Sequence, residues 1–492
     1  MRVLLVYPET PHTFWSFRSA LKFISKKSSE PPLGLLTVAA LLPGEWQKRL
    51  IDMNVTSLKD GDLRWADWVF ISGMNIHKES FQNVVRRCNK LGVKAVGGGP
   101  MCTTEPDHFM GLDHMVLGEA EEILPELIRD IQEGSARRIY AARGFPNINR
   151  SPVPLYDLLE RKKYASMSIQ YSRGCPFHCE FCSVTLLNGH KPRTKSASRF
   201  IRELESLYDL GWRGSVNIVD DNFIGNKRRI KTELLPALID WSEKHGYPFQ
   251  FSTEVSINLA DDEALIKDLV KAGMTTVFVG IETINESSLK ECRKGQNLNR
   301  DLVNSVRMLQ NHGLIVHGGF IIGFDQDPDT IFEDQIHFIQ KTGIATAMVG
   351  LLTALSGTSL FHRLKSEKRL LELASGNNMD GSLNFIPKMN YQRLMAGYHS
   401  VLNTLYSPAV YCERVKTFLR EYRVPKIQMA SVTLTDIRAF FRSLWKLGVL
   451  EKGRRSFWNL LFFTLRRYPR KFALAVTLAI YGFHFRQVIK TI

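Results

Sequence analysis

The chain has 492 residues, of which 44% are hydrophobic and 23% are charged. This length predicts two or three domains, and the composition is that of a globular protein, which excludes disordered and collagen-like classes. The net charge is +16, but residues 413–492 hold 17 Lys or Arg against 4 Asp or Glu. The body of the chain is therefore nearly neutral, and we expect no nucleic-acid partner.

The cysteines and the first residues indicate the cytoplasm. Four of the seven cysteines stand alone in the sequence, which is no disulfide framework and fits a reducing compartment. Met1 begins a short strand-like run that ends before Pro8, without the charged leader and long apolar stretch of a signal peptide.

Residues 1–135 alternate short apolar runs with amphipathic stretches. Strands are predicted at 2–7, 68–72, 94–97 and 114–117, and helices at 34–42, 81–91 and 121–131. This alternation predicts an α/β domain of doubly wound, Rossmann-like type, whose ligands lie beyond the carboxyl ends of the strands. Gly73, Gly97, Gly98 and Gly99 follow or end such strands, where a backbone without Cβ can approach a ligand. A glycine run is as often a tight turn as a binding loop.

Residues 136–164 contain three prolines and read as a linker. In residues 165–366 the alternation resumes, with strands predicted at 167–171, 215–219, 249–253, 276–280, 317–322 and 347–351 and helices between them. Six such units predict an incomplete (β/α)6 barrel of TIM type, with active groups at the carboxyl ends of its strands. Residues 367–492 are mainly helical in pattern and end in the basic, amphipathic tail.

One loop of the predicted barrel carries three cysteines. Cys175, Cys179 and Cys182 follow the first barrel strand closely, and three thiolates can hold three irons of a [4Fe–4S] cube. The fourth iron would stay open to a chelating molecule, as in catalytic metal sites. A zinc knuckle or a closed cluster is the alternative. It would need a fourth ligand, for which His178 and His190 are near and the next cysteine is over a hundred residues away.

The spacing Cys-x3-Cys-x-aromatic-Cys, with Phe181 in the aromatic position, resembles the signature of the radical SAM superfamily, where SAM is S-adenosylmethionine. The resemblance implies a [4Fe–4S] cluster whose open iron is chelated by SAM. It also implies reductive cleavage of SAM to methionine and a 5′-deoxyadenosyl radical, and an electron donor of flavodoxin or ferredoxin type.

The resemblance extends to later strand ends and implies the residues that contact SAM. They are Asp220, Asp221 and Asn222 after the second strand, Glu254 on the third, Glu282 on the fourth, and Ile321 and Gly323 on the fifth. Carboxylates and amides suit an ammonium and a ribose diol, and a glycine-apolar backbone suits a flat purine. Taken singly, Asp220 or Glu282 could equally belong to an ordinary barrel ion pair.

A doubly wound domain in front of such a barrel resembles the cobalamin-binding class of this superfamily. Residues 31–35, 72–74 and 97–100 look like the loops of that domain. The Asp-x-His-x-x-Gly motif that supplies a histidine to cobalt is absent. His77 is a conceivable ligand, but a surface or helix-capping role is the more common one for such a histidine. A nucleotide-binding relic without a corrin is the alternative.

This class implies methyl transfer to an unactivated carbon, with no side chain required as acid or base. The run from Asp220 to Asn226 resembles the subgroup of the hopanoid C-2 methylase and related lipid-modifying enzymes, so a hydrophobic small-molecule substrate is expected. Radical ring closure without methyl transfer, on a tetrapyrrole or a lipid, is the alternative. A corrinoid- or RNA-binding regulator is a more distant one.

The tail contains two apolar runs, residues 457–465 and 472–485, with arginines between them. Each is shorter than the roughly twenty residues that span a bilayer. Two interpretations stay open: a pair of core helices, or an interfacial anchor that holds the enzyme on the inner face of a membrane.

Overall fold

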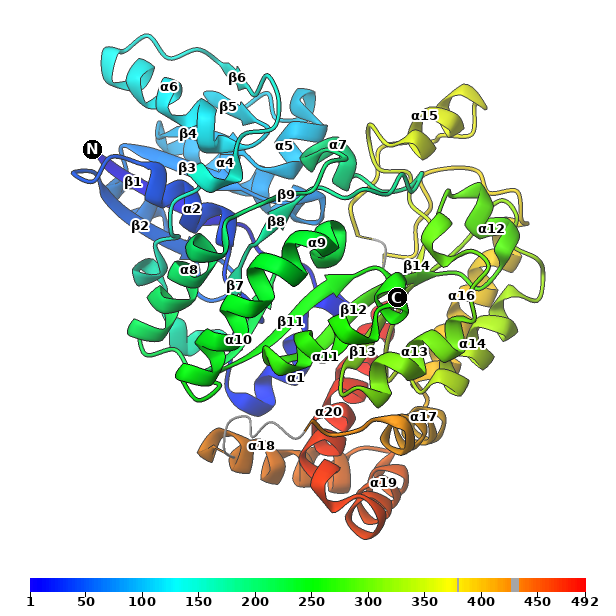
Figure 1. The fold of residues 1–492 in the computed structure, drawn as a ribbon. Coiled ribbons are helices and arrows are strands. Elements are labelled where there is room, and N and C mark those ends of the chain that lie inside the picture. Colours follow the sequence, from blue (N-terminus) through cyan, green and yellow to red (C-terminus); the bar gives the residue numbers. More distant parts are fainter. Residues whose placement is uncertain (378–379, 426–432) are drawn as a thin grey trace.

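The computed structural model describes residues 1–377, 380–425 and 433–492, which form two parallel sheets and a helical C-terminal region (Figure 1). The first sheet has the strand order β2-β1-β3-β4-β5-β6. Its strands are β1 (Arg2–Tyr7), β2 (Gln47–Asp52), β3 (Trp68–Ser72), β4 (Lys94–Gly98), β5 (His114–Leu117) and β6 (Ile139–Ala141). All of its pairs are parallel.

Helices cover both faces of this sheet, as predicted. One apolar cluster joins it to α2 (Leu33–Leu41) and α6 (Ala120–Glu133). Another joins it to α3 (Asp60–Trp65), α4 (Lys78–Leu91) and α5 (Pro100–Thr104). The chain changes face between β1 and β3, and in doubly wound sheets this switch point is where ligands bind.

Two strands of this sheet were not predicted. The sequence of β2, Gln-Lys-Arg-Leu-Ile-Asp, has no apolar run, because β2 is an edge strand with partly exposed side chains. The other edge strand, β6, has three residues and lies in the segment that reads as a linker.

The second sheet has the order β14-β13-β12-β11-β10-β7, again parallel throughout. Its strands are β7 (Ser166–Ile169), β10 (Gly214–Ile218), β11 (Phe249–Val255), β12 (Met274–Glu282), β13 (Ile315–Ile322) and β14 (Thr346–Leu351). The helices α8 (Ala197–Asp209), α10 (Leu235–Lys244), α11 (Glu263–Lys271), α13 (Leu302–Asn311) and α14 (Ile331–Thr342) alternate with them. Among the described residues β7 and β14 do not pair, which confirms the incomplete (β/α)6 barrel.

The N-terminal segment lies along the open seam of this barrel. Next to β7, Ser28 forms a parallel bridge with Tyr164, and Ser166 N donates to Ser29 O at 2.8 Å. Towards β14, η1 (Phe14–Ser16) borders a cavity inside the barrel, and α1 (Arg18–Leu21) and η2 (Lys22–Ile24) follow it. Residues 14–29 therefore contribute to the wall of the barrel.

The C-terminal region is helical, as expected, but we count it from α15 (Ser359–Ser366), which precedes the boundary predicted at residue 367. The other helices are α16 (Tyr391–Tyr406), α17 (Pro408–Glu421), α18 (Leu434–Trp445) with its continuation η12 (Lys446–Leu450), α19 (Arg454–Arg467), η13 (Pro469–Lys471) and α20 (Phe472–Ile489). In Figure 1 the red α20 lies beside the blue α1 below the green strands. Residues 469–489 are long and apolar enough to cross a membrane, but 56% of their most apolar window is buried inside the protein. The run 472–485 thus forms a core helix, α20, which is one of the two interpretations above. The run 457–465 in α19 buries one side, with Phe457, Leu460 and Leu461, and exposes Phe462 and Leu465 on the other.

Candidate active site

The carboxyl ends of the two sheets are joined by ion pairs. Arg173 is two residues before Cys175, and Glu119 and Glu121 follow β5 of the first sheet. The Arg173 guanidinium contacts Glu119 at 2.5 Å and Glu121 at 2.8 Å, and Arg193 also pairs with Glu119. All of these side chains are largely buried. Ligands at the two edges would therefore face a common space.

The three cysteines lie in a loop between β8 (Ser172–Arg173) and α7 (Val184–Asn188). Gly174 has φ +96°, and a Cβ there would lie 2.8 Å from the carbonyl oxygen of Gly189. The loop can thus cross residues 188–191 only with glycine at this position. Cys175 N donates to Gly189 O at 3.2 Å, which holds the beginning of the cysteine loop.

Polar groups around the cysteines fit an anionic cluster. Asn222 Nδ2 lies 3.8 Å from Cys175 Sγ, and Gln296 Nε2 lies 3.8 Å from Cys179 Sγ. Burial lowers the pKa of Lys294, but attraction to Glu282 and to the thiolates of Cys179 and Cys182 outweighs it, so the pKa is raised. Three cysteine sulfurs that can bind iron, two amide N–H donors that can hydrogen-bond to sulfur, and one buried cation suit a [4Fe–4S] cluster with three thiolates.

The zinc alternative finds less support. The rings of His178 and His190 stack on each other at 4.1 Å. Within residues 1–377, 380–425 and 433–492, no three Cys, His, Asp or Glu side chains converge on a point that would hold a single metal ion. A cluster has no such requirement, because its thiolates bind different irons.

The fold brings a fourth cysteine next to the loop, which sequence distance did not indicate. Glu180 N donates to the carbonyl oxygen of Cys292 at 2.9 Å. The Cys292 thiol is buried and lies 3.7 Å from the carbonyl oxygen of Leu289. Burial, with repulsion from Cys179, raises its pKa to about 12. Its thiol therefore favours the neutral form.

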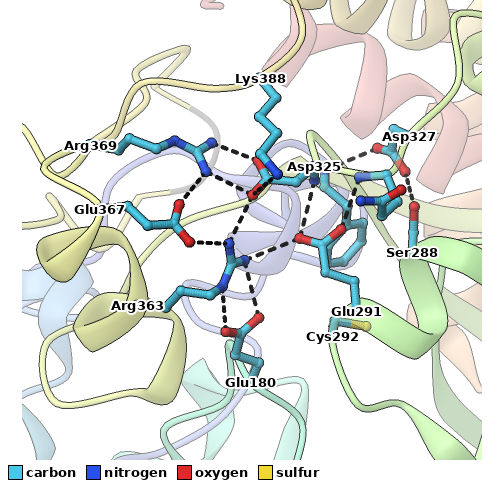
Figure 2. A network of polar contacts seen from close by, with 12 residues as sticks. Glu180, Ser288, Glu291, Cys292, Asp325, Asp327, Arg363, Glu367, Arg369 and Lys388 are labelled. Atoms are coloured by element: carbon cyan, nitrogen blue, oxygen red, sulfur yellow. Dashed lines mark hydrogen bonds and ion pairs between the residues drawn. The ribbon is translucent and has the colours of Figure 1, made fainter.

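A network of buried ion pairs fixes the middle of the cysteine loop (Figure 2). Arg363 of α15 contacts Glu180 at 2.6 Å, Asp325 at 2.8 Å and Glu291 at 3.1 Å. Arg369 contacts Asp325 at 2.6 Å from the other side. Burial alone would raise the pKa of Asp325, but the two guanidiniums hold it at about 2. The loop is thus tied to the ends of β12 and β13 through a segment of the C-terminal region.

The three polar residues after β10 have different surroundings. Asp220 is buried and accepts hydrogen bonds from Tyr171 N at 2.8 Å and Ser172 N at 2.7 Å, and burial raises its pKa to about 7. Its geometry supports the strand that leads into the cysteine loop. Asp221 is half-buried and accepts a hydrogen bond from Asn188. Asn222 reaches the cluster loop, as described above. Direct contact of these residues with SAM stays a prediction. The surroundings of Asp221 and Asn222 suit such a contact better than those of Asp220, whose carboxylate is occupied by backbone N–H groups.

Two further carboxylates lie at the ends of the central strands. Glu282 is held in a left-handed conformation, φ +62°, and forms a 2.6 Å ion pair with Lys294. Glu254 is enclosed by the barrel but stays accessible to water within it. Burial, with repulsion from Asp221, Glu30 and Glu282, raises its pKa to about 8. A cationic ligand would relieve this repulsion, which suits the ammonium group of SAM.

A cavity of about 140 Å³ lies inside the barrel next to these groups. Glu282 is its charged lining residue, and the other side chains and backbone segments are apolar, including Phe14, Trp15, Phe278, Ile321 and Met348. Trp15 packs its ring 4.9 Å from that of Phe278. The predicted adenine contact Ile321 thus borders an apolar space.

The other two predicted contacts, Gly323 and Phe181, are not among the residues that line this cavity. Gly323 has φ +110°, and its N–H donates to Asp327 at 2.9 Å, so the turn after β13 requires glycine. Phe181 is half-buried, with its ring 6.1 Å from that of Phe324. Their contacts with SAM stay predictions.

The glycines at the carboxyl end of the first sheet differ in why a side chain would not fit there. A Cβ at Gly97 would lie 2.3 Å from Leu112, so this glycine makes room for the loop that precedes β5. Gly98 and Gly99 are half-buried at the end of β4, and Gly99 has φ +88°. Gly73 is buried beside them, with its carbonyl oxygen accepting from Met101 N. A Cβ at Gly99 would lie 2.5 Å from Ser72 Oγ, so glycine is required there, and the half-buried backbone at Gly98 and Gly99 could approach a large flat group such as a corrin.

His77 is a packed histidine in this structure. Its Nδ1 accepts a hydrogen bond from Met74 N at 3.0 Å, and its Nε2 lies 2.9 Å from the Thr10 hydroxyl. Burial lowers its pKa to about 4. Because both ring nitrogens are engaged within the protein, the helix-capping interpretation describes His77 better than that of a cobalt ligand.

Sequence reasoning missed several residues of the site. Lys294 and Gln296 follow a strand end by more than ten residues, and Trp15 precedes the barrel altogether. Glu30 also enters the barrel from the N-terminal segment, where Asn217 Nδ2 donates to it at 3.0 Å and Ser168 Oγ at 3.1 Å. No motif marks these positions, and only the fold brings them together.

Comparisons with known proteins agree with this geometry. The radical SAM superfamily matches residues 169–339, a B12 binding domain matches residues 23–128, and a domain of unknown function (DUF4070) matches residues 358–492. An uncharacterized methyltransferase of Synechocystis sp. is 41% identical over 99% of this chain and 92% of its own length. The hopanoid C-2 methylase of Rhodopseudomonas palustris is 30% identical over 95% of this chain and 90% of its own length.

The solved structure of OxsB, a cobalamin-dependent SAM radical enzyme, has the same fold. It aligns with a TM-score of 0.62 at 14% identity, covering 99% of this chain and 80% of that one.

The two sheets and the helical C-terminal region define a radical SAM enzyme with a cobalamin-binding domain. The chain belongs to the cobalamin-binding radical SAM family, in the subgroup that includes the hopanoid C-2 methylase. It is a methyltransferase, and its cofactors are a [4Fe–4S] cluster, SAM and cobalamin.

Proposed function

We propose that this methyltransferase acts on an unactivated carbon of a lipid or another hydrophobic substrate. The observation that carries the proposal is the apolar cavity beside Glu282, with Trp15, Phe278 and Met348 in its wall; SAM and the reacting part of the substrate would meet there. Apolar walls bind an apolar substrate and keep water away from a reactive radical. The 30% identity with a methylase of hopanoids supports the same substrate class.

In this proposal Cys175, Cys179 and Cys182 hold the cluster, and the edge at Gly98 and Gly99 holds the corrin. When bound, the cluster would supply the electron that cleaves SAM to a 5′-deoxyadenosyl radical, and the corrin would carry the methyl group. The protein's own part is to hold the groups in place. Arg173 with Glu119 fixes one sheet edge against the other, which sets the position of the two cofactor sites.

Around SAM, we assign binding to charged side chains and exclusion of water to apolar ones. Glu254 and Asp221 lie where an ammonium would be favoured, and Lys294 is positioned to attract a carboxylate near the cluster. No side chain is assigned as acid or base, because hydrogen abstraction by a radical requires none. An electron donor of flavodoxin or ferredoxin type in the cytoplasm would reduce the cluster.

The test uses SAM labelled in its methyl carbon, with the reconstituted enzyme, a strong reductant and a total lipid extract as the substrate source. Label in an organic-soluble product supports a lipid methylase. Turnover of the extract without label in the product would favour the ring-closure alternative. Label found only in water-soluble products would overturn the hydrophobic substrate.

A further inference from the structure

The helix formed by α18 and η12 presents a row of uncovered apolar side chains. Leu434, Ile437, Phe441, Trp445 and Val449 recur every three or four residues, so they lie on one face of the helix. They are 73%, 44%, 63%, 62% and 48% exposed. The opposite face is packed, with Ala439, Ser443 and Leu447 buried. Soluble proteins rarely leave such a row uncovered without a partner for it.

The neighbouring helix extends this surface. Trp458 Nε1 donates to the carbonyl oxygen of Gly448 at 3.0 Å, which joins α19 to η12. On α19 the ring of Phe462 stacks on that of Trp458, and Phe462 is 65% exposed. Figure 1 shows α18 and α19 at the lower edge of the molecule, on the side away from the first sheet. We name the exposed face of α18, η12 and Phe462 the apolar ridge.

Basic residues surround the apolar ridge. Residues 434–470 contain nine Lys or Arg and two Asp or Glu. Arg438 lies between Ile437 and Phe441 on the same exposed side, and Arg454 and Arg455 are exposed at the beginning of α19. These three arginines form no ion pair within residues 1–377, 380–425 and 433–492. The ridge therefore requires a partner that is both apolar and anionic.

We propose that the apolar ridge docks the enzyme on the surface of an anionic lipid bilayer. Aromatic and aliphatic side chains enter the boundary between headgroups and acyl chains, and the arginines contact lipid phosphates. The proposal moves the membrane contact from the buried run 472–485 to the exposed face of α18 and η12, with Phe462 of the run 457–465 beside it. The biological reason for such docking, access to a lipid substrate, rests on the proposed function. The argument that the ridge binds a bilayer rests only on its exposed apolar and basic side chains.

Other partners fit this surface less well. A second copy of the chain, joined by a two-fold axis, would bring the same arginines against each other. A single-stranded RNA would match the charge and could stack on Phe441 and Trp445. An RNA would leave the aliphatic Leu434, Ile437 and Val449 without a partner, because nucleic acids have no apolar interior into which these side chains could insert.

The ridge is connected to the reaction cavity through the N-terminal segment. Arg442 of α18 donates to the carbonyl oxygen of Phe23 at 2.9 Å and to Ser25 Oγ at 2.6 Å. The same segment carries Trp15, which borders the cavity. The helix that carries the ridge thus contacts the segment that forms one wall of the substrate site.

The experiment is flotation of the full-length, cluster-loaded enzyme with vesicles of phosphatidylcholine alone and of phosphatidylcholine mixed with phosphatidylglycerol. We expect binding to the mixed vesicles that weakens with salt. The double variant Phe441→Ser, Trp445→Ser should bind at least about tenfold more weakly, because two large side chains no longer enter the bilayer. Arg454→Gln with Arg455→Gln should lose about fivefold per arginine on anionic vesicles.

Met110→Ser is the matched control, since Met110 is 70% exposed on the first sheet's domain and should leave flotation unchanged. Cleavage of SAM in the absence of lipid should be equal in all variants, so failure of docking is separable from failure of the proposed function. Equal flotation of the wild type and the Phe441, Trp445 variant would overturn the proposal. So would a wild-type dimer that the same variant dissociates, or a preference for RNA over anionic vesicles.

Discussion

The guanidinium of Arg363 donates two hydrogen bonds to the carboxylate of Glu180, at 2.6 and 3.2 Å. Glu180 stands between Cys179 and Cys182, whereas Arg363 belongs to α15 in the C-terminal region. The pair therefore makes the position of the cysteine loop depend on a segment almost two hundred residues later. The other carboxylates around Arg363, among them Asp325 and Glu291, would repel one another without this cation.

Replacing Arg363 by Gln should destabilise the protein and loosen the cysteine loop. Breaking a buried ion pair costs about 3 kcal/mol, and less here because Arg363 is 27% exposed. We expect a fall in Tm of several degrees and faster loss of iron to a chelator. Arg363→Lys should recover part of both. The control is Arg393→Gln, whose pair with Asp329 is exposed and contributes about 0–1 kcal/mol. Iron loss at the wild-type rate would contradict the role given to Arg363.

Alanine at Cys175, Cys179 or Cys182 should abolish the cluster, because each thiolate is assigned its own iron. Iron and sulfide analysis after anaerobic reconstitution measures the effect. Cys292→Ala is the matched control, since its buried thiol lies beside the loop but is turned towards the Leu289 carbonyl. We expect a full complement of iron in Cys292→Ala. Its loss would instead identify Cys292 as a fourth ligand and leave no open iron for SAM.

Glu282→Gln and Lys294→Ala should weaken SAM binding without removing the cluster. Each change removes one charge of a buried 2.6 Å pair next to the cavity. Charge-assisted hydrogen bonds contribute about 1.5–3 kcal/mol, so SAM affinity should fall about tenfold to a hundredfold. Anaerobic calorimetric titration with SAM measures this. Glu263→Gln, which breaks an exposed pair with Lys267, should leave the affinity unchanged. Unaltered binding in the first two variants would show that SAM lies elsewhere.

Glu254 should make the stability of the SAM-free protein depend on pH. Its pKa of about 8, against 4.5 as its ordinary value, means that the folded state holds a proton which the unfolded state has lost. The free energy of unfolding should therefore fall as the pH rises from about 4.5 to 8. Since the side chain is accessible to water inside the barrel, screening reduces the effect, and Glu254→Gln should gain about 1 kcal/mol at pH 8.

The measurement for Glu254 is Tm against pH, with and without SAM. The variant should exceed the wild type at pH 8 and match it near pH 5. SAM should raise the wild-type Tm more at pH 8 than at pH 5, because its ammonium favours the ionised carboxylate. Parallel profiles for the two proteins would contradict the raised pKa.

Buried strands were predictable because their residues form continuous apolar runs. All six barrel strands, and β1, β3, β4 and β5 of the first sheet, lie where the sequence pattern places them within a few residues. The edge strands β2 and β6 were missed, because an edge strand faces water on one side and has no such run. The cysteine loop was predictable for a different reason, since its three ligands are adjacent in the sequence.

The rest of the site depends on distant parts of the chain. Trp15 borders the cavity only because residues 14–29 follow the seam that six strands leave open. Lys294 approaches the cysteines only after β12 and α12 (Glu286–Glu291) have placed it there. Similarly, the length of an apolar run in the sequence did not distinguish a helix in the core from a helix at the surface. Burial separates them, with α20 inside and α18 outside.

The contact between Phe14 and α20 has a consequence for synthesis of the protein. His484 Nε2 donates to the carbonyl oxygen of Phe14 at 3.0 Å, across 470 residues of chain. The ring of Phe14 packs 4.7 Å from that of Phe485. While the ribosome is still synthesising the second sheet, α20 does not yet exist, so the segment with Phe14 and Trp15 cannot pack against it. We therefore expect the end of the seam at Phe14 and Trp15 to lack this support until translation has passed residue 485, so a chain truncated before α20 would expose apolar side chains to chaperones and proteases.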